Sequence, residues 1–563
     1  MNHYRWNLLP SVPTEHTLND SELPPLVIQL LYNRGITEPA DIELFLNADS
    51  RLSFDPFLLP DMHPAIARIY RALLSAEKIA IFGDFDVDGI SSTALLVQGL
   101  NALGADTTIY IPHRINEGHG LNSAALKQLH QQGVSLVITV DCGVTGIDAV
   151  KKANARGLDI IITDHHVPLE ELPPAIAVVD PMRADSEYPF RELAGVGVAF
   201  KLLQALYINM GREKELEEFL DLVALGTVAD MSPLLGENRY LVRRGLELLN
   251  AAPRLGISHM AALANKDTGS LNAEDISWFL APRLNAAGRL ENAMASYDLL
   301  TTSLPSEAYR LALLLEETNA ERQKLTASAL AIARKQVLDK GISDLLITSD
   351  SGYVGGILGL VAGKLSNEFY RPSIAIRLGD KYSSASCRSI PEFDIIQAIS
   401  SCSSLLSRFG GHSQAAGFSL PTQNLPEVEQ QLCRLASEKL AALDLKPHLD
   451  IDAEVMLDNL SGETFGTLQQ MAPFGKGNQL PVFLSRGVKV SDCQPMGNSG
   501  SHLRLKLKQN GASWEAVAFG FGDCLSKMQP VIDIVYNIEL NSWRGEESLR
   551  LNLLDLVTEN QAL

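Results

Sequence analysis

The sequence has 563 residues, of which 46% are apolar and 20% are charged. This composition is typical of a globular protein of about three to four domains and excludes a disordered chain. The formal charge of -20 argues against a general nucleic-acid coat protein, because such proteins neutralise phosphates with Lys and Arg. An enzyme acting on nucleic acid is still allowed if its basic residues are concentrated locally and bound cations supply the remaining positive charge.

Neither a membrane nor a secretory route is indicated. No apolar run approaches the ~18 residues of a membrane span, and residues 1–6 lack the charged-then-apolar profile of a secretory signal. We therefore expect a cytoplasmic protein with no membrane partner. The cysteines are scattered without a Cys-x-x-Cys pair, which argues against a zinc ribbon and against a disulfide framework. They are Cys142, Cys387, Cys402, Cys433, Cys493 and Cys524.

Residues 1–70 combine short helical patches with turns rich in Pro and Asp, and we interpret them as a packing or capping segment. From 71 to about 235, apolar runs that end in polar residues alternate with helical stretches. This alternation predicts a parallel, doubly wound α/β sheet. The expected strands are 78–82, 107–111, 135–140, 159–163 and 177–179, and the expected helices include 89–103 and 144–156.

The first of these strands leads into Gly83-Asp-Phe-Asp-Val-Asp-Gly89. The alternation places Asp84, Asp86 and Asp88 on one face of an extended chain or around one turn. Carboxylates this close repel one another unless a proton or a cation intervenes, and a hard divalent metal fits at neutral pH. A calcium loop is excluded because its twelfth position is Leu95 rather than Glu. A solvated acidic turn is the alternative.

Two further strand ends carry side chains that bind metals. Asp141 follows the third expected strand, and Asp164-His165-His166 follows the fourth. Ligands of parallel sheets bind outside the carboxyl ends of the strands, so these side chains are expected to converge with the first three aspartates. In an extended chain His165 and His166 would point to opposite sides, so that one binds metal and the other binds substrate or orients a neighbour. A surface histidine pair is the alternative.

Two further residues near these motifs are Asp230 and Cys142. Asp230 ends the apolar run 222–230. It either completes the ligand set or is a polar residue at a helix end. Cys142, beside Asp141, is interpreted as a small buried side chain, because free cysteines are among the most buried residues.

The motifs resemble those of the DHH phosphoesterase superfamily in order and spacing. The matching blocks are Gly-Asp84-x-Asp86-x-Asp88-Gly, Asp141-Cys-Gly, Asp164-His165-His166 and Ala-Asp230. The sequence around these motifs is similar to that of the single-strand-specific 5′→3′ DNA exonucleases of this superfamily. The similar stretches are Ile111-Pro-His-Arg114, Ala281-Pro-Arg-Leu-Asn-Ala-Ala-Gly-Arg289, Phe409-Gly-Gly-His412 and Pro473-Phe-Gly-x-Gly-Asn478. The resemblance extends from about 75 to the end of the chain.

This resemblance implies a site for two Mn²⁺ or Mg²⁺ ions that hydrolyses a phosphodiester bond. The implied metal ligands are Asp86, Asp88, Asp141, His165 and Asp230. The implied supporting catalytic residues are Asp84, Asp164 and His166. Mixed carboxylate and imidazole ligands suit Mn²⁺ better than Ca²⁺.

Residues 306–340 are predicted to form one long helix that ends at Gly341 and connects two globular parts. A second α/β unit follows, with strands at 345–348 and 373–377. It resembles the DHH-associated domain, in which Ser386, Arg388 and His412 would hold a phosphate of the nucleotide. A tight-turn glycine pair with a surface histidine is the alternative.

Two positions in this second unit depart from the family pattern. Tyr353-Val354 replaces the usual Trp-His, and Cys387 stands where glycine is usual. Neither departure affects the implied metal ligands. Because of both departures, the family pattern does not predict the affinity for substrate or the rate of the reaction.

The C-terminal part is rich in short alternating strands, and residues 503–508 place leucines on one face and cations on the other. Together with Trp514, Phe519 or Trp543, this basic face would suit single-stranded DNA, as in OB-folds. A solvated strand face is the alternative. The basic residues are Arg486, Lys489, Arg504, Lys506 and Lys508.

The expected fold is therefore a multidomain α/β protein with an OB-like tail. Its expected parts are a capping segment (1–70), a catalytic DHH domain (71–300), a connecting helix (301–340), a DHH-associated domain (341–445) and an OB-like domain (446–563).

The expected function is a metal-dependent, 5′→3′ exonuclease on single-stranded DNA in repair and recombination. By the resemblance, Arg283, Asn285 and Arg289 would line the DNA channel. We expect a monomer, with a helicase and a single-strand-binding protein as candidate partners. Two alternatives are a phosphodiesterase for oligoribonucleotides or cyclic dinucleotides (or a pyrophosphatase-like hydrolase) and an inactive DNA-binding scaffold.

Overall fold

The computed structural model describes residues 4–13, 15–16, 23–114, 117–497, 500–543 and 546–557, without the side chains of 542, 543 and 546. The described chain folds into two compact units. The barrel unit comprises Met1–Leu52, Pro233–Gly236 and Lys446–Leu563. The two-sheet unit comprises Ser53–Ser232 and Glu237–Leu445. Within the described residues, no helix combines the length and apolar character needed to cross a membrane.

The first sheet of the two-sheet unit is parallel throughout, with strand order β3-β2-β4-β5-β6. The predicted parallel sheet is therefore confirmed, with strand boundaries within one residue of those expected. Its strands are almost wholly apolar because helices cover both faces. They are β2 (Lys78–Phe82), β3 (Asp106–Tyr110), β4 (Val134–Val140), β5 (Asp159–Thr163) and β6 (Ala177–Val179).

Helices α5 and α6 pack on one face of this sheet, and α3, α4 and α7 pack on the other. The apolar run before Asp230 is helix α8, whose residues Leu220–Val228 are all buried. A helix buried on all sides is apolar on all sides, so its sequence shows little periodicity. The helices of this part are α3 (Met62–Leu74), α4 (Val87–Ala102), α5 (Ser123–Gln131), α6 (Ile147–Asn154), α7 (Gly195–Met210), α8 (Leu220–Ala229), α9 (Gly236–Ala251), α10 (Leu255–Leu263), α11 (Ala273–Asp275), α12 (Ala281–Leu290) and α13 (Met294–Thr301).

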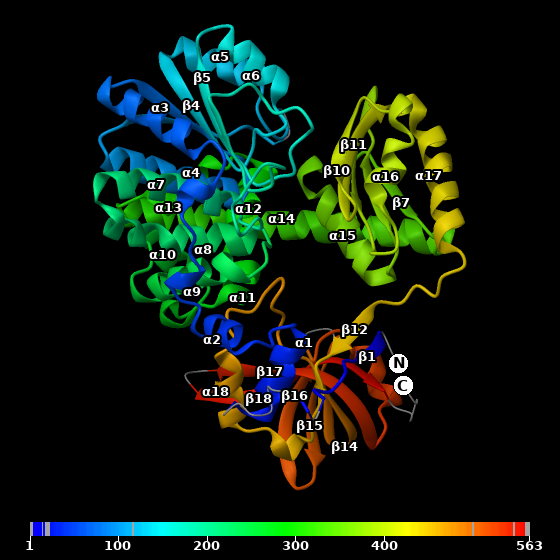
Figure 1. Ribbon diagram of the computed structural model, residues 1–563. Coiled ribbons are helices and arrows are strands. Elements are labelled where there is room, and N and C mark those ends of the chain that lie inside the picture. The colour runs from blue at the N-terminus through cyan, green and yellow to red at the C-terminus, as the bar shows by residue number, and fades with distance from the viewer. Residues whose placement is uncertain are drawn as a thin grey trace. The chain divides into compact units, whose positions relative to one another are not determined.

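The predicted long helix is α14 (Pro305–Lys340), and it ends at Gly341 in a positive-φ conformation. Its first half packs against α10, α12 and α13, whereas its second half packs against α15 and β7 (Figure 1). The helix therefore contributes side chains to two cores as well as joining them. Tertiary packing stabilises such a helix more than its intrinsic propensity does.

The second sheet has strand order β10-β11-β9-β8-β7, in which only the β7–β8 pair is parallel. Its strands are β7 (Leu346–Asp350), β8 (Ser373–Arg377), β9 (Tyr382–Arg388), β10 (Arg408–His412) and β11 (Ala415–Pro421). The accompanying helices are α15 (Leu358–Phe369), α16 (Ile395–Ser400) and α17 (Leu425–Leu440). Helix α15 follows the glycines at 355–356 as the sequence predicts.

The barrel unit contains a sheet of order β13-β14-β15-β16-β18-β17, closed by pairing of β14 with β17. Closure of the sheet gives the barrel that the alternating C-terminal strands predict. The strands are β12 (His448–Ile451), β13 (Ala453–Glu454), β14 (Phe483–Met496), β15 (His502–Gln509), β16 (Ala512–Ala518), β17 (Val531–Trp543) and β18 (Glu546–Val557). Helix α18 (Gly462–Gln469) completes this part.

The N-terminal segment packs on the barrel as far as Leu52. Strand β1 (Arg5–Leu8) pairs with β12, and helix α1 (Pro25–Asn33) places side chains in the barrel core; α2 (Pro39–Asn47) follows. The expected capping segment extends to 70, but from Ser53 onward the chain belongs to the two-sheet unit. A segment of mixed short helices and turns does not reveal in its sequence which core receives its apolar residues.

Candidate metal centre and substrate groups

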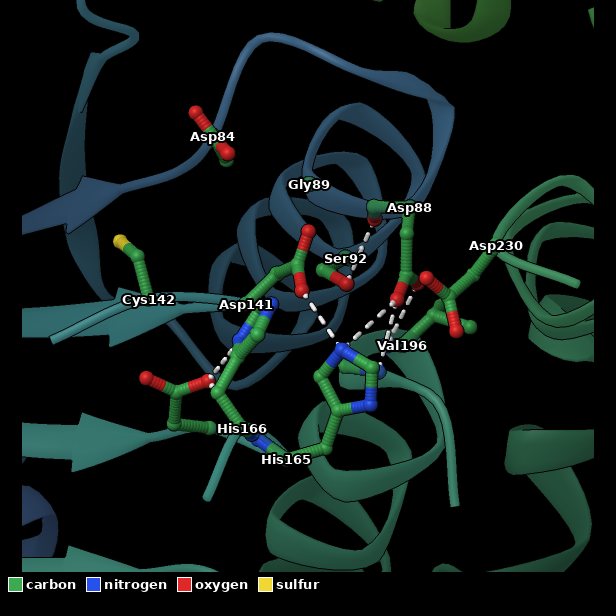
Figure 2. Close-up of polar contacts among 12 residues, drawn as sticks. Asp84, Asp88, Gly89, Ser92, Asp141, Cys142, His165, His166, Val196 and Asp230 are labelled. Carbon is green, nitrogen blue, oxygen red and sulfur yellow. Dashed lines mark hydrogen bonds and ion pairs between the residues drawn. The ribbon is translucent and has the colours of Figure 1, made fainter. Parts of the chain in front are cut away.

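The three strand ends that carry the acidic motifs lie beside one another. Strand β2 is paired with β4, and β4 with β5, so the residues after Phe82, Val140 and Thr163 meet at one edge of the sheet. The chain turns directly from β2 into α4, so the three aspartates of the first motif fan around a helix start rather than along a strand. This edge forms the candidate site shown in Figure 2.

Helix N-termini fix two of these aspartates. Asp86 is the N-cap of α4 and accepts hydrogen bonds from the amides of Asp88 and Gly89, at 3.1 and 3.2 Å. The Asp88 carboxylate accepts hydrogen bonds from the amides of Gly195 and Val196, at 2.7 and 2.8 Å. These amides open α7, where the helix dipole favours a negative charge. Both carboxylates are therefore held in place before any cation binds.

Asp141 follows β4 with a φ of 58°, a left-handed backbone conformation that is unusual for a residue other than glycine. This conformation belongs to a residue that is only 3% exposed and faces His165. The Asp141 Oδ1 atom lies 3.1 Å from His165 Nε2, and Asp88 Oδ2 lies 3.9 Å from the same nitrogen. Strained backbone of this kind often occurs at functional sites.

Among the residues that the structure describes, three groups of side chains could each hold a metal ion, because the ligand atoms of each group lie within 4.8 Å of one another. The groups are Asp84–Asp86–Asp141, Asp88–His165–Asp230 and Asp141–His165–His166. Buried His165 Nε2 has no hydrogen-bond partner among the described residues, although acidic oxygens surround it. A buried nitrogen that makes no hydrogen bond and is directed at carboxylates fits a divalent metal ligand.

Burial and mutual repulsion raise the pKa values of the central carboxyl groups. The pKa of Asp88 is raised to about 7 by burial and by the nearby Asp230 charge. The pKa of Asp141 is raised well above its ordinary value by burial and by Asp88, and that of Asp86 is raised by burial and Asp84. A cation among these groups would remove the repulsion, so the donor set fits Mn²⁺ or Mg²⁺.

Asp164 and His166 form hydrogen bonds that hold the loop next to the site. Asp164 accepts hydrogen bonds from the Val144 and His165 amides, at 2.9 and 2.8 Å, and its Oδ1 lies 2.7 Å from His166 Nδ1. Burial opposes the charge on Asp164, but these hydrogen bonds outweigh it and lower its pKa. The hydrogen bond between Asp164 and His166 raises the pKa of His166 to about 9. Asp164 therefore fixes the loop that carries the histidines.

The two histidines do not point to opposite sides as an extended chain predicts. Their ring centroids lie 4.5 Å apart, and both rings have a nitrogen near Asp141. The expectation assumed a continuing strand, but β5 ends at Thr163 and the loop beyond it turns. Cys142 is buried and its pKa is raised well above the ordinary value, mainly by burial, which is consistent with the small buried side chain that the sequence suggests.

His119 is a residue of the site that the sequence did not reveal. Its Nδ1 lies 3.2 Å from Asp84 Oδ2, and its ring packs on Phe85. No motif marked His119, because it lies in a glycine-rich loop far from the strand ends. Asp84 itself belongs to one of the three possible metal groups, so it can act as a ligand as well as a supporting residue.

Several arginines lie near Arg289, which itself lies near Asp86 of the acidic edge. Burial lowers the pKa of Arg289 to about 10, and the nearby charges of Arg114 and Arg322 contribute to this lowering. Buried Arg289 Nε lacks a hydrogen-bond partner among the described residues. Burial and Arg114 also lower the pKa of Arg388. Like charges gathered with an unpaired donor suit an anion such as phosphate. Arg114 and Arg322 had no assigned role from the sequence.

Arg283 and Asn285, which were also expected to contact substrate, have protein partners. Arg283 forms an ion pair with Glu316 at 2.5 Å, and Asn285 Oδ1 accepts a hydrogen bond from the Val87 amide at 3.2 Å. Ser386 lies on β9 opposite Gly417, and His412 is exposed at the end of β10. Tyr353 and Cys387, where the family pattern changes, are buried in the cores beside α15 and α16.

The barrel carries the predicted alternation, with buried leucines and exposed cations along β15. Acidic neighbours pair with two of the five cations: Arg486 with Glu454 at 3.2 Å and Arg504 with Glu515 at 3.2 Å. The exposed cations that remain are Lys489, Lys506 and Lys508.

Of the aromatic residues expected beside these cations, Phe519 is 49% exposed. Trp514 packs on the barrel core and donates a hydrogen bond to the Leu457 carbonyl. The Trp543 side chain lies outside the described part of the structure.

Family models match the three folded parts of the chain. Residues 78–227 match the DHH family, N-terminal domain; residues 342–438 match the DHHA1 domain; and residues 451–555 match the RecJ OB domain. The first match covers the parallel sheet and most of the proposed metal ligands. Fold and site together define a phosphoesterase of the DHH class, with the domain types that the sequence predicted.

Curated relatives identify the family within this class. The single-stranded-DNA-specific exonuclease RecJ of Bacillus subtilis is 36% identical over 95% of this chain and 68% of its own length. The corresponding RecJ of Dickeya dadantii is 32% identical over 96% of this chain and 97% of its own length. The chain belongs to the RecJ family of single-stranded-DNA-specific exonucleases, and the expectation of a hydrolase is confirmed.

A solved relative has the same fold. The crystal structure of RecJ in complex with Mn²⁺ from Thermus thermophilus has a TM-score of 0.85 and 29% identity, covering 100% of this chain and 80% of that chain. RecJ of the same organism has also been solved in complex with Mg²⁺, with a TM-score of 0.79 and 27% identity over 100% of this chain and 79% of that chain. These are the two ions expected from the donor set.

Proposed function

We propose that this protein is a metal-dependent exonuclease that hydrolyses single-stranded DNA from its 5′ end with two Mn²⁺ or Mg²⁺ ions. The metal part of this proposal is supported by buried, mutually repelling carboxylates that converge on a His165 nitrogen without a hydrogen bond among the described residues. The proposed ligands are Asp86, Asp88, Asp141, His165 and Asp230, with Asp84 as a further candidate.

Each part of the site has a proposed task. Two metal ions about 3.5–4 Å apart can activate a water and stabilise the leaving oxygen of an in-line displacement at phosphorus. Asp164 and His166 keep the His165 loop in place. Arg289 and Arg388, with Ser386 and His412, bind phosphate oxygens.

The DNA path and the domain division are also proposals. Arg283 and Asn285 line the path beside α4, and the exposed lysines of the barrel bind the backbone of the following nucleotides. We propose a division into a catalytic part (71–300), a connecting helix (301–340), a DHH-associated part (341–445) and a barrel part (446–563). The family matches support it because each match falls inside one of these parts.

We further propose a cytoplasmic monomer that acts in DNA repair and recombination with a helicase and a single-strand-binding protein. These assignments rest on the family, as does the 5′→3′ direction. The test is a product time course with Mn²⁺ on single-stranded DNA labelled at either end. Immediate release of label as mononucleotide from the 5′-labelled strand alone supports the proposal. First release from the 3′-labelled strand contradicts the direction, and binding without any release indicates a scaffold.

A further inference from the structure

Helix α14 of the two-sheet unit carries a partly buried arginine, Arg322, that the proposed site does not use. Its Nε atom is buried and has no hydrogen-bond partner among the described residues. Two acids of the same helix have other partners: Glu316 pairs with Arg283 at 2.5 Å, and Glu321 pairs with Lys324 at 3.7 Å. Withdrawing a guanidinium group from water without a counter-charge is costly, so its position indicates a ligand that brings negative charge.

Two arginines of the neighbouring helix α12 lie close to Arg322. Burial and then the charge of Arg283 lower the pKa of Arg322. The charge of Arg322 in turn adds to the effects of burial and of Arg114 in lowering the pKa of Arg289. Helix α12 packs against α14, and the six residues from Arg283 to Arg289 span about 9 Å of helix. Arg322 therefore faces this stretch of α12.

The arginines continue beyond Arg289. Arg114 lies near Arg289, and its charge also contributes, after burial, to the lowered pKa of Arg388. The guanidinium groups thus follow one another in the order Arg388, Arg114, Arg289, Arg322 and Arg283. Like charges in such a row repel one another unless anions lie beside them. Each phosphate of a DNA strand brings one negative charge, so the row suits more than one phosphate.

A further polar side chain beside Arg322 is unsatisfied. Asn319, one turn earlier on α14, is 1% exposed, and its Oδ1 atom has no hydrogen-bond partner among the described residues. Residues three apart are neighbours on a helix surface, so Asn319 and Arg322 lie side by side. The buried Nε atom of Arg289 is in the same condition. Buried polar atoms are nearly always hydrogen-bonded, so three such atoms between two packed helices indicate a position that a ligand or water completes.

We propose that Arg322 binds a phosphodiester group of the single-stranded substrate, different from the phosphate that Arg289 and Arg388 bind. Asn319 lines the same position from one turn earlier on α14. The proposal rests on the DNA-hydrolysing function proposed above and adds a second phosphate position to its substrate path. It implies that the long helix contacts the strand as well as joining two cores.

The test measures which phosphates contribute to binding. The full chain is titrated, without divalent metal so that the strand is not cleaved, with short single-stranded oligonucleotides in which one phosphate at a time is an uncharged methylphosphonate. In the unchanged protein, neutralising a contacted phosphate should weaken binding about tenfold or more, as expected for a hydrogen bond between charged groups. In Arg322→Gln we expect one phosphate position to lose this effect, and in Arg289→Gln a different position.

Arg334→Gln is the matched control, because Arg334 lies on the same helix and its guanidinium pairs with Glu368 at 2.7 Å. This variant should show the same dependence on each phosphate as the unchanged protein. Thermal unfolding separates a substrate contact from a structural role. Since Arg322 Nε has no protein partner to lose, Arg322→Gln should keep or raise the melting temperature. A lower melting temperature with an unchanged phosphate dependence would overturn the proposal.

The remaining outcomes distinguish this proposal from the proposed function. If Mn²⁺ and the unmodified strand yield no nucleotide in the product time course, the proposed function itself is wrong. If the strand is cleaved but Arg322→Gln depends on each phosphate as the unchanged protein does, only the Arg322 proposal is overturned. The same conclusion follows if Arg322→Gln and Arg289→Gln lose the effect of the same phosphate, because the two arginines would then share one anion.

Discussion

At the scale of single residues, the metal centre depends on side chains held in place before an ion arrives. The Asp88 carboxylate accepts hydrogen bonds from two backbone amides at the start of α7, and the Asp141 backbone has a left-handed conformation. Burial and then repulsion by Asp230 raise the pKa of the Asp88 carboxyl to about 7, and a bound cation would relieve this repulsion. Sequence motifs predicted these residues as metal ligands, but they did not predict how the side chains are oriented.

Replacement of Asp141 by Asn tests the centre most directly. Asn tolerates a positive φ, so the change removes charge with little backbone strain. We expect turnover to fall by more than the ~10–100-fold typical of an outer support, with binding of single-stranded DNA largely retained. Nuclease rates and a gel-shift assay measure the two effects. Asp148→Asn, at an exposed position in α6, is the control, and equal activity in both variants would refute the assignment.

Arg289 tests the phosphate site. We expect Arg289→Gln to weaken binding of short single-stranded DNA and to reduce the slope of log affinity against log salt concentration by about 0.7, because one phosphate contact is lost. Fluorescence titrations over a salt series give this slope. Arg310→Gln removes an exposed guanidinium already paired with Glu307 and should leave the slope unchanged. An unchanged slope in Arg289→Gln would argue against phosphate contact.

At the scale of elements, close helix packing brings the ligands together. A Cβ atom on Gly226 of α8 would lie 2.7 Å from both Asp88 Oδ1 and Val196 Cγ1. One on Gly195 of α7 would lie 2.6 Å from Asp141 Cβ. The sequence predicted the strands beneath these helices within one residue, but it did not show that α7 and α8 approach the strand ends so closely. Glycine at these contacts gives no periodic signal.

Gly226→Ala should therefore destabilise the protein, although alanine has a higher helix propensity than glycine. Alanine gains about 0.8–1.0 kcal/mol over glycine inside a helix, but overpacking typically costs about 1–3 kcal/mol. We expect a lower melting temperature and weaker Mn²⁺ binding as Asp88 is displaced. Gly466→Ala in α18 has open space around its Cβ and should stabilise the protein. Thermal unfolding compares the two, and stabilisation in both would show that α8 can move without loss.

At the scale of the whole molecule, a chain with a net charge of -20 must still hold a polyanion. Acidic residues gather where cations would bind, and exposed lysines lie on the barrel. Arg486 and Arg504 have acidic partners, so the basic face is narrower than the sequence indicated. Local charge distribution, rather than total charge, determines the affinity for DNA.

Replacing Lys489, Lys506 and Lys508 together by Gln tests this distribution. We expect the salt slope for long single-stranded DNA to fall by about 2, from three contacts at about 0.7 each, with little change in the cleavage of very short oligonucleotides. The matched control replaces the exposed lysines Lys127, Lys152 and Lys214 of the two-sheet unit. Equal losses on long and short substrates would contradict a separate DNA-binding role for the barrel.

The sequence by itself determined the strand ends, the long helix to Gly341 and the order of the acidic motifs, because these follow from local periodicity and from residues next to one another in the chain. Only the tertiary structure revealed His119 beside Asp84 and the arginines around Arg289. These features join residues that are far apart in the chain, and they are fixed by which surfaces pack together. No local pattern in the sequence indicates which surfaces pack together.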